Sequence, residues 1–386
     1  MQASQYDYIF LGAGCATLSI VLRMIESNNF ATKKILIIDK EKKNKNDRTW
    51  CFWEKEADFF EKIVYKTWSN LSFKTDNTSI ALDIQPYQYK MIRGIDFYNY
   101  CFDHISYSEN VDVVFGKITF ENENGINSIR LNNEELNFSK NTFIFNSIYK
   151  PGSKQKGKYY LLQHFKGWII ETEKDCFDPG SGTLMDFRVS QQHGTTFVYV
   201  LPLSSKTALV EYTLFTDAFL SQEEYDNGLK DYLKNYTDLE EYKVTDEEFG
   251  VIPMTNAVFP SFTNGMYFIG TAGGQTKAST GYTFKFIQKQ SAQIVKELSY
   301  GKLPLKKLKQ DRFYFYDSTL LNILVNRTLA GKDIFSTLFR KNKAALVFKF
   351  LDNETNIPED FKIINSLPKK EFLKAGLREL SKMIAS

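Results

Sequence analysis

The chain has 386 residues, of which 43% are hydrophobic and 15% aromatic, and its formal net charge is +3. This length suits two or three domains with substantial cores, and the composition excludes a disordered chain. Residues 301–386 carry 17 Lys and Arg against 9 Asp and Glu, so the charge is concentrated at the C-terminal end. The basic region suits an anionic lipid surface, but it has no recognisable nucleic-acid-reading motif, so nucleic acid is not expected as a partner.

The four cysteines and three histidines are scattered and include no Cys-x-x-Cys pair. They predict neither a metal site nor a disulfide framework, and a reduced, cytoplasmic protein is expected. The first residues carry no charged segment ahead of an apolar run, which argues against a signal peptide. Since no apolar run approaches the ~20 residues that cross a bilayer, we expect a chain that does not span the membrane.

The first predicted element is a short apolar strand at 8–11, followed by Gly12-Ala-Gly14 and a helix from 16 to about 27. A buried strand at 35–38 then ends at Asp39. This βαβ unit predicts an α/β fold with a Rossmann-like domain. The glycines would let a pyrophosphate approach the helix N-terminus, and Asp39 can accept hydrogen bonds from a ribose. The candidate dinucleotide-binding residues are therefore Gly12, Ala13, Gly14 and Asp39, with a tight turn that binds no ligand as the alternative.

Short strands are expected within 62–90, then a helix over 95–108 and further strands at 111–115, 117–121, 126–131 and 143–145. A polar break at 152–157 precedes a strand-rich region over 159–251, which holds one helix near 222–236. The sequence predicts three parts: a discontinuous Rossmann-like domain (1–150 and 252–300), a β-rich domain (151–251) and a helical, basic C-terminal region (301–386). Residues 62–90 of the first part could cross into the β-rich domain.

A β-hairpin is predicted where two β-branched, aromatic-rich runs flank the turn at 202–206. Glu211 is the only carboxylate of this segment, and alternation along the strand puts it beside Leu209, Thr213 and Phe215. Desolvation raises the pKa of a carboxyl group, and a neutral acid in an apolar pocket is a proton donor. The alternative is a solvated glutamate on an edge strand.

A second glycine-rich turn follows the buried strand expected at 266–269 and precedes a helix over about 283–298. It offers a further set of backbone N–H groups to an anion or to a flavin carbonyl. Two such turns about 260 residues apart favour a flavoprotein over a plain NAD enzyme. The candidate cofactor residues of this turn are Gly270, Gly273, Gly274, Gly281 and Tyr282.

On these features the chain resembles the FAD-dependent lycopene β-cyclases of the bacterial type, over most of its length. The segments that carry the resemblance are Gly12-Ala-Gly14, Asp47-Arg-Thr-Trp-Cys-Phe-Trp53, Gln163-His-Phe-Lys-Gly-Trp168, Met185-Asp-Phe-Arg188, the hairpin over 197–213 and Ser279-Thr-Gly-Tyr282. The resemblance implies a Rossmann-like FAD-binding domain, a β-rich substrate domain and an added helical C-terminus. It also implies cyclisation of lycopene to β-ionone rings (β-carotene, via γ-carotene) without net redox change, using reduced FAD and NAD(P)H as the reductant.

The resemblance also implies residue roles. Glu211 matches the essential acid of the family, and Asp186 is a second catalytic candidate that has a purely structural alternative. Arg48 is expected to neutralise an FAD phosphate, with a surface ion pair as the alternative. The residues expected to line a polyene channel are Trp50, Trp53, Trp168, Tyr199 and Tyr212, and for each of the three tryptophans core packing is the alternative.

Three positions depart from the pattern of the family and its flavoprotein relatives. Thr271 stands where many flavoproteins have an acid, and Ala278 stands where many relatives have proline. Tyr212 takes the place of the second glutamate of the plant motif. None of these departures removes the acid chemistry, although Tyr212 bears on the type of ring that is formed.

The predicted C-terminal helix over 369–384 places Leu373, Leu377, Leu380 and Ile384 on one stripe, with basic residues around it. This pattern suits a peripheral helix on the inner face of the cell membrane, where an acyclic carotenoid dissolves. The alternative is a helix that packs on its own domain. Rival functions on the same scaffold are a flavin-dependent hydroxylase or isoprenoid reductase, and a non-catalytic carotenoid-binding flavoprotein.

Overall fold

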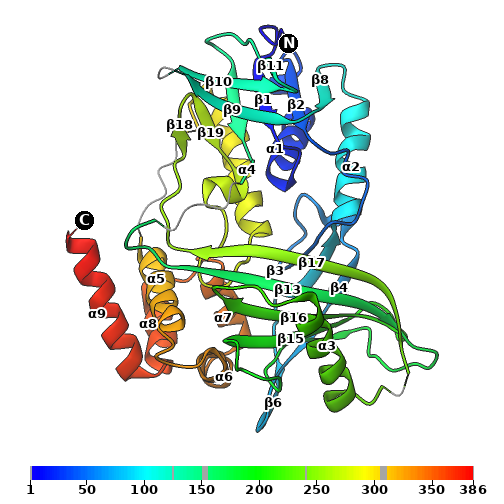
Figure 1. Cartoon of the computed structure of the whole chain (residues 1–386), viewed down its shortest axis with the longest axis vertical. Helices are drawn as coiled ribbons and strands as arrows, with labels where there is room; N and C mark the ends of the chain where they lie inside the picture. Colours follow the sequence, from blue (N-terminus) through cyan, green and yellow to red (C-terminus); the bar gives the residue numbers. More distant parts are fainter. Residues whose placement is uncertain (1, 124–125, 150–154, 240, 305–310, 386) are drawn as a thin grey trace.

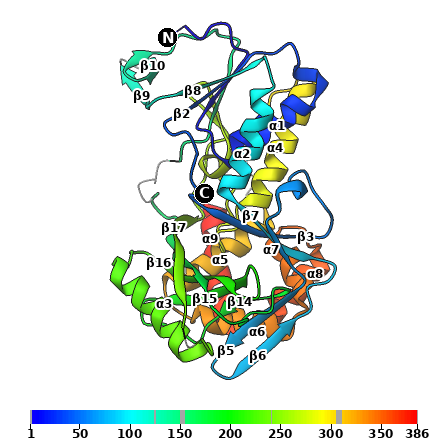
Figure 2. The ribbon, with the colours of Figure 1, turned by 90° about the vertical axis from the view of Figure 1, so that its right-hand side faces the viewer.

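The structure of the protein is a computed structural model, which describes residues 2–123, 126–149, 155–239, 241–304 and 311–385. The first half of the polar break expected at 152–157, residues 152–154, lies outside these residues. An upper lobe holds the chain start, and a lower lobe combines a broad sheet with the C-terminal helices (Figure 1). A view turned by 90° shows the same two lobes, with α1, α2 and α4 in the upper one (Figure 2).

The upper lobe is built on a sheet whose strands are parallel except for β18, and this sheet is called the parallel sheet below. In spatial order its strands are β18 (Phe262–Thr263), β19 (Met266–Phe268), β12 (Phe143–Asn146), β1 (Tyr8–Leu11), β2 (Ile35–Asp39) and β8 (Val111–Phe115). β1 and β2 are apolar at nearly every position because both faces of the sheet are covered, as in other parallel sheets.

Helices cover one face of the parallel sheet, and a small antiparallel sheet covers the other. The helices are α1 (Cys15–Glu26), α2 (Gly94–Ser106) and α4 (Phe284–Ser299). The small sheet consists of β9 (Ile118–Glu123), β10 (Ile126–Leu131) and β11 (Glu134–Glu135). Alternation divides each strand between these layers: Phe10 and Ile37 face the helices, whereas Leu11 and Ile38 pack in a cluster with Ile129. Short 3-10 turns lie at η1 (Asn28–Phe30), η2 (Glu61–Ile63) and η3 (Gly270–Gly273).

The lower lobe is built on a second sheet, called the large sheet below. In spatial order its strands are β17 (Lys243–Thr255), β13 (Tyr160–Glu171), β16 (Thr207–Thr216), β15 (Thr195–Pro202), β14 (Ser181–Asp186), β5 (Asn70–Thr75) and β6 (Thr78–Leu82). β15 and β16 form the expected hairpin, with Tyr199 opposite Glu211. β16 is an interior strand between β13 and β15, so the edge-strand alternative for Glu211 was wrong.

The large sheet is also covered on both faces. α3 (Gln222–Tyr236) packs on one face through a cluster that includes Val210, Tyr212 and Tyr225. The other face meets α6 and its neighbours, where Phe335 contacts Phe215. The C-terminal helices are α5 (Arg312–Val325), α6 (Gly331–Lys341), α7 (Ala344–Leu351), α8 (Ile357–Ser366) and α9 (Lys369–Ala385). In the part of the chain that the structure describes, no helix has both the length and the apolar character to cross a membrane.

A second small antiparallel sheet lies where the lobes meet. Its order is β3 (Thr49–Glu54), β7 (Gln88–Arg93) and β4 (Lys66–Trp68), and β7 runs directly into α2. The sequence did not predict β3 as a strand. The fold class expected from the sequence is confirmed: an α/β chain with a Rossmann-like domain, a β-rich domain and a helical C-terminal region.

Candidate active site

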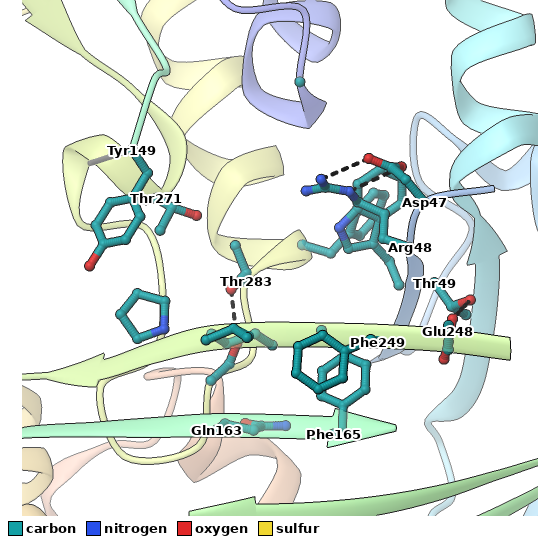
Figure 3. A pocket seen from close by; sticks show the side chains of 18 of the residues that line it. Asp47, Arg48, Thr49, Tyr149, Gln163, Phe165, Glu248, Phe249, Thr271 and Thr283 are labelled. Atoms are coloured by element: carbon teal, nitrogen blue, oxygen red, sulfur yellow. Dashed lines mark hydrogen bonds and ion pairs between the residues drawn. The ribbon is translucent and has the colours of Figure 1, made fainter. Parts of the chain in front are cut away.

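A cavity of about 710 Å³ lies between the parallel sheet and the large sheet. Its upper wall contains the first glycine turn, and its lower wall contains strands β13, β16 and β17. Arg48 and Thr271 project from the upper side, while Gln163, Phe165 and Phe249 rise from the strands below (Figure 3). The cavity therefore brings together residues that are more than two hundred positions apart in the sequence.

The first glycine turn is shaped for a close approach from the cavity. Gly12 has φ +93°, and a Cβ atom there would lie 2.5 Å from Ser147 Oγ, so only glycine fits without a shift. A Cβ atom on Gly14 would meet no heavy atom within 4 Å, which leaves open space in front of α1. Gly14 is also the N-cap of α1 and no side chain caps this end, so the first N–H groups of the helix are available to an anion.

Asp39 lies at the end of β2 and lines the cavity. Its Oδ2 accepts a hydrogen bond of 2.6 Å from the backbone N–H of Ala13, and its Oδ1 accepts one of 2.9 Å from Glu41. Lys43 approaches the same carboxylate to 3.7 Å. Asp39 thus holds the glycine turn in place at the mouth of the cavity, and Ala13 itself is completely buried beneath it.

The second glycine turn contributes through two separate regions. Gly281 and Tyr282 line the cavity, together with Thr271 and Thr283. Gly270 does not line it; a Cβ atom there would lie 2.8 Å from Ala16 Cβ, so this glycine lets η3 press against α1. Gly273 and Gly274 line a different cavity of about 570 Å³.

Two buried polar atoms in the cavity wall have no hydrogen-bond partner among the described residues. They are Gln163 Oε1 on β13 and Thr280 Oγ1 beside the second glycine turn. Such unpaired atoms are uncommon in protein interiors, and a bound polar ligand satisfies them. Gly281 has φ +74°, and a Cβ atom there would lie 2.1 Å from Gln163 Oε1. The glycine therefore brings the second turn into direct contact with β13.

Arg48 lies on the upper side of the cavity and forms a bidentate pair with Asp47, with nitrogen–oxygen distances of 3.2 and 2.9 Å (Figure 3). Tyr98 also donates to Asp47, over 2.9 Å. About half of the Arg48 side chain is exposed, and it faces the cavity in which the first glycine turn lies. The guanidinium is thus held at a position where it adds positive charge to an anion-binding region.

Glu211 projects from β16 into the lower part of the cavity. Its Oε1 accepts a 2.7 Å hydrogen bond from Thr213 Oγ1. Desolvation by burial raises the pKa of Glu211 well above its usual range, and the negative charge of Glu248 raises it further. The Glu211 side chain is half-buried, and the part that stays accessible faces the cavity. Burial and the neighbouring Glu248 thus both favour the protonated form of Glu211.

Glu248, on the neighbouring part of β17, is a cavity residue that sequence reasoning missed. Its Oε2 accepts a 2.7 Å hydrogen bond from Thr49 Oγ1, which joins β17 to β3 (Figure 3). Burial raises the pKa of Glu248, while the hydrogen bonds from Thr49 and from Glu211 lower it. In the sequence Glu248 stands in an acidic run that is typical of a solvated strand, so only the strand register could have identified it.

Aromatic residues and one thiol line the cavity that contains the Glu211 carboxyl. Tyr89, Tyr199, Tyr282, Cys51 and Trp50 all line the cavity, and the sequence had marked three of these five residues. Burial raises the pKa of Tyr282 to about 12 and that of the Cys51 thiol well above its usual range. These groups are therefore uncharged, and they offer ring faces and edges instead of ions. Such surroundings suit a substrate without hydrogen-bonding groups.

Asp186, Trp168 and Tyr212 do not line this cavity, because they lie on the opposite face of the large sheet. Trp168 and Tyr212 belong to the cluster that packs beneath α3. Asp186 is fully buried, accepts a hydrogen bond from Tyr232 of α3 over 2.9 Å and forms a bidentate pair with Arg188. Alternation along β16 explains the separation, since neighbouring residues such as 211 and 212 point to opposite faces.

Trp53 is also outside the cavity lining. It is buried in the core between the lobes, where it stacks on Phe348 of α7 with ring centroids 4.4 Å apart. Its other contact is edge-to-face with Tyr282, which does line the cavity. Trp53 therefore supports a cavity residue from behind.

The comparisons with known proteins agree with this architecture. A family model described as "Lycopene cyclase protein" matches residues 7–376. The lycopene beta-cyclase of Pseudescherichia vulneris is 27% identical over 189 residues, which is 47% of each chain, so the match spans about half the length of this curated relative.

Solved structures of flavoprotein type share the fold. A geranylgeranyl bacteriochlorophyll reductase-like protein from Thermoplasma acidophilum has a TM-score of 0.66 at 13% identity and covers 97% of this chain and 99% of its own. A flavoprotein/dehydrogenase from Cytophaga hutchinsonii has a TM-score of 0.59 at 11% identity, with coverage of 98% and 100%. At these identities the likeness establishes the fold alone. The family model covers most of the sequence, and on that ground this chain belongs to the lycopene cyclase family.

Proposed function

We propose that this protein is a lycopene β-cyclase, which closes the ends of an acyclic carotenoid into β-ionone rings by acid-initiated chemistry. The observation that carries the proposal is the place of Glu211: a carboxyl group, whose pKa burial raises, in an aromatic-lined cavity that also contains a dinucleotide-type glycine turn. Membership of the lycopene cyclase family supports the same reaction. Lycopene is a hydrocarbon, so an acid that keeps its proton is the group that can attack it.

The cofactor in this proposal is FAD, and the residues present fit it. The uncapped N-terminus of α1 and the open space at Gly14 suit a pyrophosphate, and Arg48 adds positive charge beside it. Asp39 lies where a ribose is bound in such folds. Thr271, Thr280 and the backbone around Gly281 are placed toward the flavin end of such a ligand. Reduced FAD would supply negative charge close to a developing cation, and NAD(P)H is the proposed source of its electrons.

In the proposed reaction, the Glu211 O–H bond breaks and its proton adds to a carbon of the terminal double bond of the substrate. The electron pair of a neighbouring double bond then forms the ring carbon–carbon bond. A ring carbon loses a proton, the electrons of that C–H bond become the ring double bond, and the proton returns to Glu211. Atoms and charge balance over the cycle, so the product is an isomer of the substrate.

The aromatic part of the cavity wall contributes by stabilising positive charge. The rings of Tyr89, Tyr199 and Trp50 present aromatic faces and edges to the cavity. Aromatic faces attract a cation electrostatically. The raised pKa of Tyr199 and of Cys51 keeps both side chains neutral in this role. Asp186 is assigned a structural role, because it ties α3 to the large sheet.

The test is expression of Glu211→Gln in cells that accumulate lycopene. We expect cyclised product to fall by at least ~100-fold, since general acid catalysis contributes about 10²–10⁴-fold to rates. Flavin content should stay at the wild-type level, because glutamine keeps the size of the side chain and leaves the first glycine turn unchanged. Continued cyclisation by this variant would remove Glu211 from the mechanism.

The rival activities are distinguished in the same system. A flavin-dependent hydroxylase or isoprenoid reductase, which the structural neighbours make a specific alternative, would consume NAD(P)H in step with product. A cyclase would form many product molecules per reductant, since the reaction has no net redox change. A non-catalytic carotenoid-binding flavoprotein would bind lycopene and return it unchanged. Product analysis with measured NAD(P)H consumption separates the three outcomes.

A lipid surface is the second part of the proposal, and α9 carries it. The helix packs on the lower lobe through Ala375 and Glu379, which are 3% and 4% exposed. Phe372 also packs inward against the core, whereas Leu377 is 67% and Ile384 is 79% exposed. An exposed apolar stripe of this kind is arranged for an apolar medium rather than for water.

Exposed apolar residues also occur on α8, where Ile357 and Phe361 are 59% and 60% exposed. Basic residues accompany the stripe along α9, including Lys369, Lys374 and Arg378. Lysine and arginine beside an inserted apolar face attract anionic headgroups. We therefore place the peripheral membrane contact at α8 and α9, on the inner face of the cell membrane, where the carotenoid substrate dissolves.

A further inference from the structure

Gly167 lies between Glu211 and Glu248 in the large sheet. It is paired across the ladder with Glu211 of β16 on one side and with Glu248 of β17 on the other. Directly paired residues project to the same face of a sheet, so both carboxyl groups extend over Gly167 on the cavity face. A Cβ atom on Gly167 would lie 3.0 Å from Glu248 Cγ and 3.3 Å from Glu248 Oε1. The missing side chain leaves the room in which the two carboxyl groups meet.

In the pair formed by Glu211 and Glu248, one oxygen atom of each carboxyl group accepts a hydrogen bond from a threonine hydroxyl. Thr213 donates to Glu211 Oε1 and Thr49 donates to Glu248 Oε2, each over 2.7 Å. One oxygen of each carboxyl remains for the other carboxyl, and the two groups are hydrogen-bonded to each other. This contact raises the pKa of Glu211 and lowers that of Glu248, so Glu211 donates the shared proton and Glu248 accepts it.

The remaining groups that face the pair are neutral or negative. Tyr89, Tyr199, Tyr282 and Cys51 surround Glu211, and burial raises the pKa of each. Asp246 adds negative charge on the side of Glu248. The lysine next to Gly167, Lys166, forms ion pairs with Asp226 and Glu247 and does not line the cavity. Among the described residues, the structure thus provides no cation at the pair that would favour ionising both acids.

We propose that Glu248 is the positioning residue that keeps Glu211 protonated at neutral pH, by accepting a hydrogen bond from its carboxyl group across Gly167 and by holding a negative charge beside it. This inference rests on the proposed function, in which Glu211 is the acid. Thr49 of β3 contributes to this arrangement, because its hydroxyl donates a hydrogen bond that stabilises the carboxylate form of Glu248. A proton returning from the ring is then kept by Glu211 rather than lost, since two adjacent carboxylates repel each other.

The test is the pH profile of cyclisation by Glu248→Gln, a variant of the same size that keeps a hydrogen-bond acceptor but removes the charge. We expect the alkaline limb of the profile to move down by about one pH unit or more, as for a like charge removed from a carboxyl pair. Activity at pH 6 should stay within a few fold of wild type, whereas activity at pH 8 should fall about ten-fold or more. Gly167→Ala should move the limb in the same direction, because its methyl group separates the carboxyl groups.

Glu247→Gln is the matched control, since it removes the same charge one position earlier on β17 while its ion-pair partner, Lys166, lies outside the cavity lining. Its pH profile should follow wild type. If Glu248→Gln keeps the wild-type alkaline limb, or if Glu247→Gln shifts as far, the proposal is overturned.

A readout independent of activity separates this proposal from the proposed function. Infrared difference spectroscopy reports protonated carboxyl groups directly. Wild type should show one at neutral pH that disappears in Glu211→Gln and that titrates at lower pH in Glu248→Gln. If these bands behave so but no carotenoid is cyclised, the pair stands and the assigned reaction fails. If lycopene is cyclised but the Glu211 band titrates identically with and without Glu248, the reaction stands and the pair is wrong.

Discussion

His164 is a buried titratable side chain outside the cavity, and protein groups contact both of its ring nitrogens. Its Nε2 lies 2.6 Å from Thr216 Oγ1, and the Thr216 hydroxyl itself donates to the carbonyl of Ala218. His164 must therefore donate from Nε2, which leaves Nδ1 to accept from the hydroxyl of Tyr225. Desolvation by burial lowers the pKa of His164 to about 4, so the neutral ring is the form that the fold holds.

This arrangement predicts a pH-dependent stability. The unfolded histidine has a pKa of about 6.5, so between about pH 6.5 and pH 4 the unfolded chain binds a proton that the folded protein excludes. Stability contributed by His164 is therefore complete above this window and is lost as the pH falls through it. We expect a loss of about 2 kcal/mol in the free energy of unfolding between pH 7 and pH 5, measured by urea denaturation.

His164→Gln serves as the comparison, because it cannot take up a proton. The variant should be less stable than wild type at pH 7, since it changes the contacts with Thr216 and Tyr225, and the difference should shrink by about 2 kcal/mol at pH 5. Equal pH slopes for the two proteins would show that His164 is protonated in the folded state as readily as in the unfolded chain.

At the level of elements, the contact between η3 and α1 joins the two glycine turns. Gly270 has φ +60°, and a Cβ atom there would lie only 2.8 Å from Ala16 Cβ. The missing side chain therefore allows η3 to approach α1 closely. The backbone N–H of Gly270 also donates to Gln290 Oε1 of α4 over 2.9 Å. This packing fixes the second turn against the start of α1, where the proposed pyrophosphate lies.

Gly270→Ala should therefore lose both stability and cofactor. We expect a decrease of about 2–4 kcal/mol in the free energy of unfolding, from the strained φ and the overlap with Ala16, together with a lower flavin content after purification. Gly265→Ala is the matched control: Gly265 has φ +75° but a Cβ atom there would meet nothing within 4 Å. It should show only the backbone cost of about 1 kcal/mol and normal flavin content. Equal losses in the two variants would contradict a specific contact between η3 and α1.

Strand alternation accounts for much of what the sequence could and could not predict at this scale. It correctly placed Glu211 with Leu209 and Thr213, and the same rule puts Tyr212 on the opposite face, beneath α3. Glu248 escaped detection because alternation orders residues within one strand only. Which strand lies beside β13, and in which register, is decided by pairing across more than thirty residues of intervening chain.

At the scale of the whole molecule, the two lobes enclose the cavity and the C-terminal helices present the apolar surface. α9 lies at the outer edge of the lower lobe, well away from the parallel sheet (Figure 1). Its attachment depends on a polar contact, in which Glu379 Oε1 accepts from Tyr159 and from Asn322 of α5 over 2.6 and 2.9 Å. The exposed stripe can therefore be changed without disturbing the way in which the helix is held.

A double substitution, Leu373→Glu with Leu377→Glu, tests the membrane surface. We expect binding to anionic vesicles to fall by at least ten-fold, because each change removes an inserted apolar side chain and adds a charge that the lipid repels. Thermal stability should stay near wild type, since both residues are about two-thirds exposed. Vesicle co-sedimentation is the measurement.

Tyr107→Glu is the control for this experiment. Tyr107 is 88% exposed at the end of α2 in the upper lobe, so it carries the same kind of change on a surface remote from α9. Its vesicle binding should match wild type. Unchanged binding of the double variant would remove α9 from the membrane contact.

The sequence by itself determined the local features of this protein: the βαβ start, both glycine turns, the hairpin that carries Glu211 and the apolar stripe of the last helix. These features depend on spacing of 2 or 3.6 residues and on glycine at turns, so short windows of sequence encode them. Only the tertiary structure decided which of the marked residues meet. It places Glu211 and Glu248 on either side of Gly167, and both line the same cavity as Gly14. It places Asp186, Trp168 and Tyr212 on the opposite face of the large sheet. The reason is physical: strand order, register and the docking of the lobes follow from burial of surfaces contributed by the whole chain, which no local pattern contains.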